Sequence, residues 1–281
     1  MTLVENNGPG TDLLLGSLDQ MAIEHCLVIG ITGPPGAGKS TLTSALIQLL
    51  RKQEKKVGII AVDPSSPLSG GAILGDRVRM MDHALDPGVI VRSMASRGRL
   101  GGLCASAGAV ARIMGSCGCD VILIETVGVG QSEIDIVRLA DLTLMVLAPG
   151  FGDDIQAMKA GLLEVADCIC VNKSDLAGAE ALCLEMEQLF RGRDDGIGRV
   201  ISTRGHDGTG VAELLDLLLT LSSVLRQSGK LARRRNRSLE RETLDWALEL
   251  LRPHLLEKIE RGDDQQDPRL RAERLTNEWR Q

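Results

Sequence analysis

The chain has 281 residues and a mass of 30.1 kDa, long enough for one full α/β domain and a smaller second unit. Aromatic residues make up 1% of it and the net charge is −6, which excludes base-stacking platforms and argues against a general nucleic-acid binder. No apolar run approaches the roughly 20 residues needed to cross a bilayer, so no membrane-spanning segment is expected.

The first segment, "MTLVENNGPGTDLLLG", has neither the basic region of a secretory signal nor the Arg-rich character of a transit peptide. Residues 1–24 are therefore expected to form a short N-terminal arm of a reduced, cytoplasmic protein. Two cysteine pairs, at 117 and 119 and at 168 and 170, have a spacing that would put each pair on one face of a strand. Each pair is either part of the core or half of a metal site.

Continuous apolar runs recur along the chain, with helical patterns between them. The runs cover residues 26–32, 57–63, 88–92, 120–126, 142–149, 168–173 and 199–203. Such runs are typical of strands buried on both faces, as in a parallel sheet. Between them, segments such as 41–56 and 153–166 carry apolar residues at three- and four-residue spacing. The alternation predicts an α/β fold with a doubly wound, mostly parallel sheet, whose ligand lies at the carboxyl ends of the strands.

The first strand runs into "GPPGAGKS", which fits the G-x-x-x-x-G-K-[ST] pattern and precedes a helical segment. In this P-loop, backbone N–H groups and the helix N-terminus favour phosphate oxygens, Lys39 reaches the β- and γ-phosphates, and the Ser40 hydroxyl binds Mg²⁺. The predicted phosphate-binding residues are Gly33, Pro34, Pro35, Gly36, Ala37, Gly38, Lys39, Ser40 and Thr41. The sequence therefore predicts a P-loop NTPase.

"NKSD", which contributes Asn172, Lys173 and Asp175, directly follows the apolar run "CICV". A carboxylate at that strand end can accept hydrogen bonds from N1–H and the 2-amino group of guanine, a pair that adenine does not offer. We therefore expect GTP and GDP as the bound nucleotides. One βα unit later, "ISTRG" places Ser202, Thr203 and Arg204 where a base-covering loop would lie, although an ordinary strand end also fits.

Carboxylates at two further strand ends suggest a Mg²⁺ site. Glu125 precedes a Gly-containing loop in which the Gly128 amide can reach the γ-phosphate, and Asp63 ends the second strand. Asp76, in a Gly-rich segment, is either a third metal-site carboxylate or a helix N-cap. The predicted metal set is thus Ser40, Asp63, Asp76 and Glu125, with Lys39, Glu125 and Asp76 as the catalytic groups.

The residues that assist hydrolysis are less defined. Gln131 either orients the attacking water or is an ordinary loop residue. Four arginines could stabilise transition-state charge, and the sequence does not distinguish among them: Arg77, Arg79, Arg92 and Arg97.

After residue 222 the alternation stops, so residues 25–222 are expected to form the GTPase domain and 223–281 a helical extension. One helical stripe there should either form a homodimer or fold back onto the GTPase domain. It consists of Leu244, Ala247, Leu251, Leu255 and Ile259, with Pro253 predicted to kink the helix. A basic cluster at 233–235 and 237 is either a solvated helix start or a docking site for an acidic partner. The polar end of the chain is expected to be loosely ordered.

Six motifs in order resemble the methylmalonyl-CoA mutase-associated GTPases of the MeaB/ArgK type: "GPPGAGKST", "VDPSSPLSGGAILGDRVRM", "SRGRLGGL", "ETVGVGQSE", "GDDIQAMKAG" and "VNKSD". The resemblance covers roughly residues 25–220. It implies a dimeric SIMIBI-class G-protein chaperone that gates cofactor loading into an adenosylcobalamin-dependent acyl-CoA mutase and protects that enzyme. A cobalamin adenosyltransferase is an implied second partner.

Carried to this chain, the resemblance implies that Ser40, Asp63, Asp76 and Glu125 surround Mg²⁺, that residues 33–41 hold phosphates and that Asp175 reads guanine. It also places Asp154, Gln156 and Lys159 in a third switch that signals to the mutase. The family's N-terminal arm is longer than the one here, and the C-terminal stripe resembles the family's dimerisation helix only loosely.

Three other functions fit a P-loop protein of this size, and one of them is a catalytically inert, nucleotide-gated scaffold. A P-loop kinase or ATPase linked to a transport system needs no guanine-reading carboxylate, which the chain has. A metallochaperone GTPase of the nickel type usually carries His-rich or clustered Cys/His sites, whereas the four His here are scattered.

Overall fold

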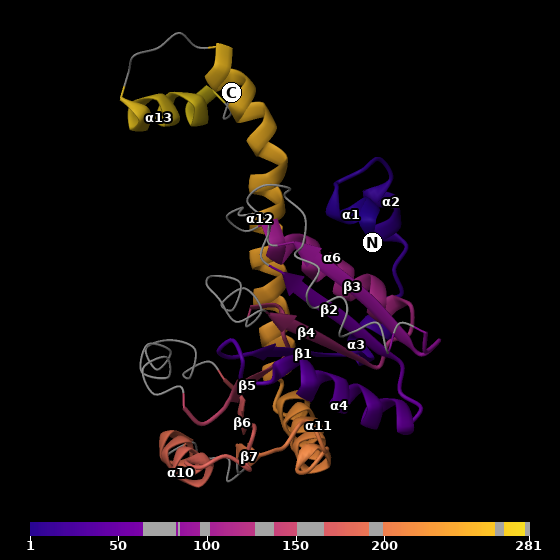
Figure 1. Ribbon diagram of the computed structural model, residues 1–281. Helices are drawn as coiled ribbons and strands as arrows, with labels where there is room; N and C mark the ends of the chain where they lie inside the picture. Colours follow the sequence, from indigo (N-terminus) through magenta and orange to yellow (C-terminus); the bar gives the residue numbers. More distant parts are fainter. Residues whose placement is uncertain are drawn as a thin grey trace.

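The computed structural model describes residues 1–63, 83, 85–95, 102–126, 138–150, 166–190, 199–261 and 267–278. A seven-stranded parallel sheet occupies its centre (Figure 1). The strands are β1 (Leu27–Thr32), β2 (Val57–Asp63), β3 (Val89–Ala95), β4 (Val121–Thr126), β5 (Leu142–Leu147), β6 (Cys168–Val171) and β7 (Val200–Ser202). Six of them lie within the predicted apolar runs, and β3 begins in the run 88–92 and continues to Ala95, which confirms the predicted doubly wound α/β fold.

The strand order is β3-β2-β4-β1-β5-β6-β7, so β1 is central and the chain winds outward from it in both directions. Because all strands are parallel, their carboxyl ends meet at one edge, where β1, β4 and β6 run into the predicted nucleotide motifs. We call this the carboxyl edge and the opposite one the amino edge.

Side chains alternate between the two faces of the sheet, and helices cover both. Helices α4 (Lys39–Lys52) and α11 (Val211–Gln227) bury one face through Ile29, Leu144 and their neighbours. Helices α6 (Gly102–Ser116) and α10 (Ala179–Phe190) bury the other. Full burial of such a side chain stabilises the fold by about 1.5–3 kcal/mol, so this aliphatic core needs few aromatic residues.

The N-terminal arm is helical and packs on α6. It comprises α1 (Thr2–Glu5), α2 (Thr11–Gly16) and α3 (Gln20–His25). Val4 is fully buried beside Ile113 of α6. The Glu5 carboxylate accepts a 2.5 Å hydrogen bond from Arg92 Nε, which raises the pKa of that guanidinium. Arg92 is the one predicted transition-state arginine that the structure describes, and its guanidinium binds the arm.

The C-terminal extension is a long helix, α12 (Lys230–Arg261), followed by α13 (Pro268–Glu278), where loose order had been expected. Helix α12 packs on α6 and α11 and then continues past α6 toward α13 (Figure 1). Pro253 lies within the helix. The predicted stripe is not buried: Leu244 is 50% exposed and Ile259 is 41% exposed.

No helix among the described residues is both long and apolar enough to cross a membrane. The predicted boundary at residue 222 falls inside α11, and the division into arm, GTPase domain and extension stays a prediction.

Candidate nucleotide-binding site

The predicted phosphate loop connects β1 to α4 at the carboxyl edge, and two of its glycines are required by their surroundings. Gly33 has φ +141°, and a Cβ there would lie 2.0 Å from the carbonyl oxygen of Val146 in β5. Gly38 has φ +91°, and a Cβ there would lie 2.4 Å from Nδ2 of Asn172. The loop is therefore pressed against both β5 and the residue that follows β6, which leaves no room for side chains at these positions.

Lys39 and Ser40 begin helix α4, so the positive end of its dipole points into the loop. Lys39 is 6% exposed, and its ammonium donates to the carbonyl oxygens of Gly33 (2.8 Å) and Pro34 (3.0 Å). A cation held across the loop in this way can bind phosphate oxygens.

The hydroxyl of Ser40 donates to Oε1 of Glu125 at 2.6 Å, although the two residues are 85 positions apart. Glu125 is 4% exposed and lies near the end of β4, in register with Ile31 of β1 and Ala61 of β2. Parallel pairing therefore brings a predicted metal-site hydroxyl and carboxylate together. Both are oxygen ligands of the type that Mg²⁺ prefers, so this pair fits the ion.

Asn172 joins the predicted base-reading segment to the phosphate loop. Its Nδ2 donates to the carbonyl oxygen of Ala37 at 2.9 Å and approaches that of Gly38 at 3.5 Å. Lys173 adds a hydrogen bond from Nζ to the carbonyl oxygen of Gly36 at 2.7 Å. Sequence reasoning placed both residues at the base, whereas the structure shows their side chains holding the loop.

The segment after β7 holds Asn172 from the other side. Oδ1 of Asn172 accepts from the Thr203 hydroxyl at 3.1 Å and from the backbone N–H of Gly205 at 3.0 Å. Thr203 is fully buried, while Ser202 is exposed and Arg204 pairs with Asp207 at 3.4 Å. The Thr203 hydroxyl therefore binds the Asn172 side chain. The contact from the Gly205 N–H to the same oxygen was not predicted from the sequence.

Asp175 lies beyond this network, exposed to solvent. Lys173 has φ +56°, a left-handed conformation that is uncommon for a residue other than glycine and turns the chain sharply after β6. The Asp175 carboxylate is therefore accessible to a base bound beside the phosphate loop.

Several predicted residues lie outside the described part of the chain: Asp76, Gly128, Gln131, Arg77, Arg79, Arg97, Asp154, Gln156 and Lys159. Asp63 is the last residue of β2, but its side chain also lies outside the described part. Glu125, Lys39 and Ser40 are the catalytic or metal candidates whose side chains can be placed.

The cysteine pairs do not form a metal site within the described residues, where no group of three or more His, Cys, Asp or Glu side chains could hold an ion. Cys168 and Cys170 both face the core covered by α4 and α11, as the strand spacing predicted. Burial raises the pKa of Cys170 to about 12 and that of Cys26, whose thiol also lies near Cys119 and Asp141, to about 12. These thiols are core residues. The expectation for the other pair was wrong, because Cys117 and Cys119 lie between α6 and β4 and not on a strand, and Cys117 is exposed.

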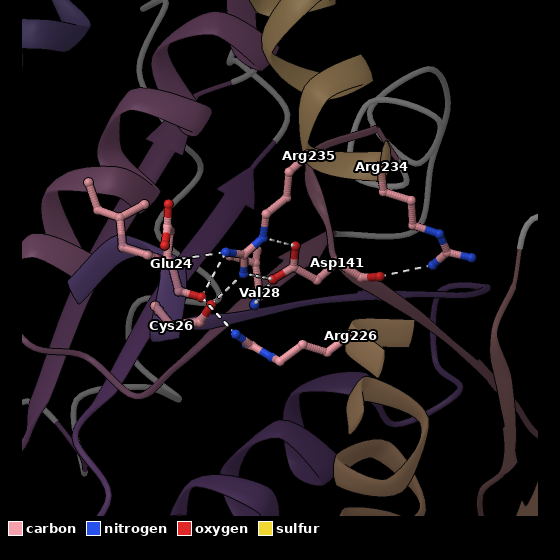
Figure 2. Close-up of polar contacts among 8 residues, drawn as sticks. Glu24, Cys26, Val28, Asp141, Arg226, Arg234 and Arg235 are labelled. Carbon is pink, nitrogen blue, oxygen red and sulfur yellow. Dashed lines mark hydrogen bonds and ion pairs between the residues drawn. The ribbon is translucent and has the colours of Figure 1, made fainter. Parts of the chain in front are cut away.

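A second charged network lies at the amino edge and was not anticipated (Figure 2). Asp141, immediately before β5, accepts two hydrogen bonds from Arg235 of α12, at 2.8 Å and 2.5 Å. Its Oδ2 also accepts from the N–H of Val28 in β1 at 2.9 Å. Arg235 further donates to the carbonyl oxygens of Glu24 (2.9 Å) and Cys26 (2.6 Å), which caps the end of α3. Burial disfavours its charge, but bonding to Asp141 outweighs that effect and raises the pKa of Arg235.

Asp167, immediately before β6, is bound in the same way by the neighbouring arginine. It accepts two hydrogen bonds from Arg234, at 2.7 Å and 2.8 Å, and one from the N–H of Thr143 in β5 at 3.0 Å. Arg234 also donates to the carbonyl oxygen of Asp141 at 2.9 Å. The prediction for the basic cluster was thus wrong at these two arginines, which bind carboxylates of their own chain. The sequence does place a carboxylate directly before each of two buried strands, but no local pattern pairs these carboxylates with Arg234 and Arg235.

Comparison with known proteins identifies the family to which these features correspond. The family model described as methylmalonyl Co-A mutase-associated GTPase MeaB matches residues 1–263. A Pyrococcus horikoshii protein is 46% identical over 248 residues, which cover 86% of this chain and 78% of that protein. The GTPase ArgK of Escherichia coli is 35% identical over 274 residues, covering 94% and 82%.

A solved structure, described as an LAO/AO transport system kinase, superposes with a TM-score of 0.64. The match covers 96% of this chain and 86% of that one at 24% identity, so it supports the fold alone. The family match confirms the resemblance found in the motifs.

Proposed function

Because this chain belongs to the MeaB family of methylmalonyl-CoA mutase-associated GTPases, we propose that it is a Mg²⁺-dependent G-protein chaperone for an adenosylcobalamin-dependent acyl-CoA mutase. The chain is a GTPase, and GTP hydrolysis to GDP and phosphate is its reaction. The proposal assigns that reaction a purpose, which is to gate cofactor loading into the mutase and to protect the mutase from inactivation.

The observation that carries the proposal is the hydrogen bond from Asn172 to Ala37. It joins the segment that ends in Asp175 to the phosphate loop, so one nucleotide can contact both. A carboxylate at this place selects guanine, because adenine would leave it without hydrogen-bond donors. The same relationship supports a G protein over the kinase alternative.

In the proposed site, the loop of residues 33–41 and the N-terminus of α4 hold the phosphates. Lys39 stabilises negative charge on the β- and γ-phosphate oxygens. Ser40 and Glu125 would hold Mg²⁺, and Asp63 and Asp76 complete the proposed set. When bound, the ion neutralises charge that develops on the phosphate oxygens.

The proposed partners are inferred from the family to which the chain belongs and from the apolar residues that the single chain leaves exposed. The apolar stripe of α12 supports a homodimer, because Leu244 and Ile259 remain accessible in a single chain. An adenosyltransferase is proposed as the donor of the mutase cofactor, and the cytoplasm as the compartment. The third switch is proposed to include Asp154, Gln156 and Lys159.

The test is GTP hydrolysis measured with and without an adenosylcobalamin-dependent acyl-CoA mutase. We expect slow intrinsic turnover that rises when the mutase is added, because an ordered switch completes transition-state stabilisation. Gln156→Ala and Lys159→Ala should keep the intrinsic rate and lose the stimulated part. A mutase that neither binds nor changes the rate in any nucleotide state would overturn the chaperone proposal and leave the GTPase assignment intact.

A further inference from the structure

The two strands held by helix α12 at the amino edge both reach the phosphate loop at their other ends. Strand β5 begins directly after Asp141. Its residue Val146 packs so closely against Gly33 of the phosphate loop that a Cβ on Gly33 would lie 2.0 Å from the Val146 carbonyl oxygen. Strand β6 follows Asp167 and leads to Asn172, which bonds to Ala37. The same two strands thus connect the N-terminal end of α12, which carries Arg234 and Arg235, to the predicted nucleotide site.

Strand β1 belongs to the same connection. Asp141 accepts the N–H of Val28 through its side chain and donates its own N–H to the carbonyl oxygen of that residue at 2.8 Å. Asp167 is joined to Thr143 of β5 by the same pair of bonds, the backbone one at 2.9 Å. These reciprocal bonds fix the axial register among β1, β5 and β6. A hydrogen-bonded strand barely compresses along its axis, so a shift at the amino edge moves the residues that touch the loop.

The bonds that hold α12 there are strong ones. The side chains of Asp141 and Asp167 are 3% and 6% exposed, and each receives a two-pronged guanidinium contact. Buried, bidentate pairs of this kind hold a fixed geometry, and loss of one partner leaves a costly unpaired charge. The N-terminal end of helix α12 therefore cannot move without moving the first residues of β5 and β6.

We propose that Arg234 and Arg235 are positioning residues for nucleotide binding, and that through them α12 controls how long bound GDP is retained. A shift of the N-terminal end of α12 would therefore move the phosphate loop relative to Val146 and Asn172. This inference rests on the nucleotide site of the proposed function. It adds that the C-terminal extension is connected to that site through Asp141, Asp167 and the strands that follow them.

A matched control lies on the same helix. Arg112 of α6 makes a bidentate pair with Glu242 of α12, at 2.5 Å and 2.6 Å, and Glu242 is as buried as the two aspartates. This pair fixes α12 to a helix instead of to strands that touch the loop. Arg112→Lys should therefore loosen α12 by a similar amount without displacing β5 or β6.

The experiment measures release of a fluorescent GDP analogue from the full chain and from Arg234→Lys, Arg235→Lys and Arg112→Lys, with the melting temperature of each. Lysine keeps the charge and loses the fork geometry. We expect release to accelerate roughly three- to tenfold in the first two variants and to stay within about twofold in Arg112→Lys. Hydrogen exchange at the backbone amides of Gly33, Gly36, Ala37 and Gly38 should rise in the first two alone.

Equal losses of melting temperature with unchanged release in Arg234→Lys and Arg235→Lys would overturn the coupling. Equal acceleration in Arg112→Lys would also overturn it, because general loosening would then explain the effect. If Arg235→Lys does not fold, Arg234→Lys decides, since its side chain is already 39% exposed. An unmodified chain that does not bind GDP would instead overturn the nucleotide site, and this inference with it.

Discussion

The side-chain amide of Asn172 donates to the carbonyl oxygen of Ala37 across 2.9 Å, so the residue that opens the predicted base-reading segment also holds the phosphate loop. Thr203 and Gly205 complete the arrangement by donating to the Asn172 carbonyl oxygen at 3.1 Å and 3.0 Å. Three separate loops at the carboxyl edge are thereby organised by one buried side chain, which is 2% exposed.

Replacing that side chain should weaken nucleotide binding without removing any direct nucleotide contact. In Asn172→Ala the Ala37 carbonyl and the Thr203 hydroxyl lose a buried partner, which costs about 1–3 kcal/mol. We expect the dissociation constant for GDP to rise roughly tenfold or more by calorimetry. Asn236→Ala, on the exposed side of α12, is the control and should change nothing. Unchanged GDP affinity in Asn172→Ala would show that the loops keep their places without it.

Base selection should depend on Asp175. The unmodified chain is expected to prefer GTP and GDP to ATP and ADP by roughly 100-fold or more, because adenine leaves the carboxylate without its donors. Asp175→Asn should shift preference toward xanthine nucleotides, whose 2-oxo group accepts from the new amide. Calorimetry with guanine, adenine and xanthine nucleotides measures both effects, and equal affinity of the unmodified chain for ATP and GTP would reject the assignment.

Hydrolysis should depend on Lys39 and on the Ser40–Glu125 pair. Lys39→Ala is expected to abolish turnover, because it removes the cation that the loop holds through the carbonyl oxygens of Gly33 and Pro34 and that would stabilise charge on the phosphates. Glu125→Ala should lower kcat by about 100-fold and raise the Mg²⁺ concentration needed for half-maximal rate. The measurement is a Mg²⁺ titration of the steady-state rate. If kcat and Mg²⁺ dependence both survive in Glu125→Ala, the carboxylate belongs to some other part of the site.

Alkaline pH should destabilise the fold through its buried thiols. Burial raises the pKa of Cys170 from 9.0 to about 12, so the folded chain retains a proton that the unfolded chain releases. The contribution is complete below pH 9 and is lost as pH rises toward 12, by about 1.4 kcal/mol per pH unit for one such thiol.

Urea unfolding at a series of pH values above 9 tests this effect. Cys170→Ala should show a shallower loss of unfolding free energy with pH than the unmodified chain. Cys117→Ala, which removes an exposed thiol, is the control for loss of a cysteine outside the core. Identical slopes for all three proteins would mean that Cys170 does not titrate differently in the folded and unfolded states.

The stripe on α12 should mediate a homodimer. Leu244→Asp combined with Leu251→Asp places charge on the stripe and should convert a dimer into a monomer in light scattering. Leu250→Asp is the control: Leu250 is 52% exposed and, at 100° per residue, faces another side of the helix. An unmodified chain that is already monomeric at tens of micromolar would contradict the dimer.

The sequence by itself determined the order of the strands and the place of the phosphate loop. Continuous apolar runs identified all seven strands, because a strand covered on both faces must be apolar at nearly every position. The phosphate loop and "NKSD" could be recognised because their chemistry requires particular residues at particular places. Binding phosphate through backbone N–H groups requires glycines at fixed positions, and selecting guanine requires a carboxylate.

Only the tertiary structure decided what individual polar side chains do. The glycine at 38 was read as a phosphate-loop requirement, but the side chain that excludes a Cβ there belongs to Asn172, far along the sequence. The arginines at 234 and 235 looked like a surface cluster, because nothing local marks Asp141 and Asp167 as their partners. Hydrogen bonds and ion pairs act over a few ångströms between residues that parallel β-pairing brings together, and that proximity has no local signature in the chain.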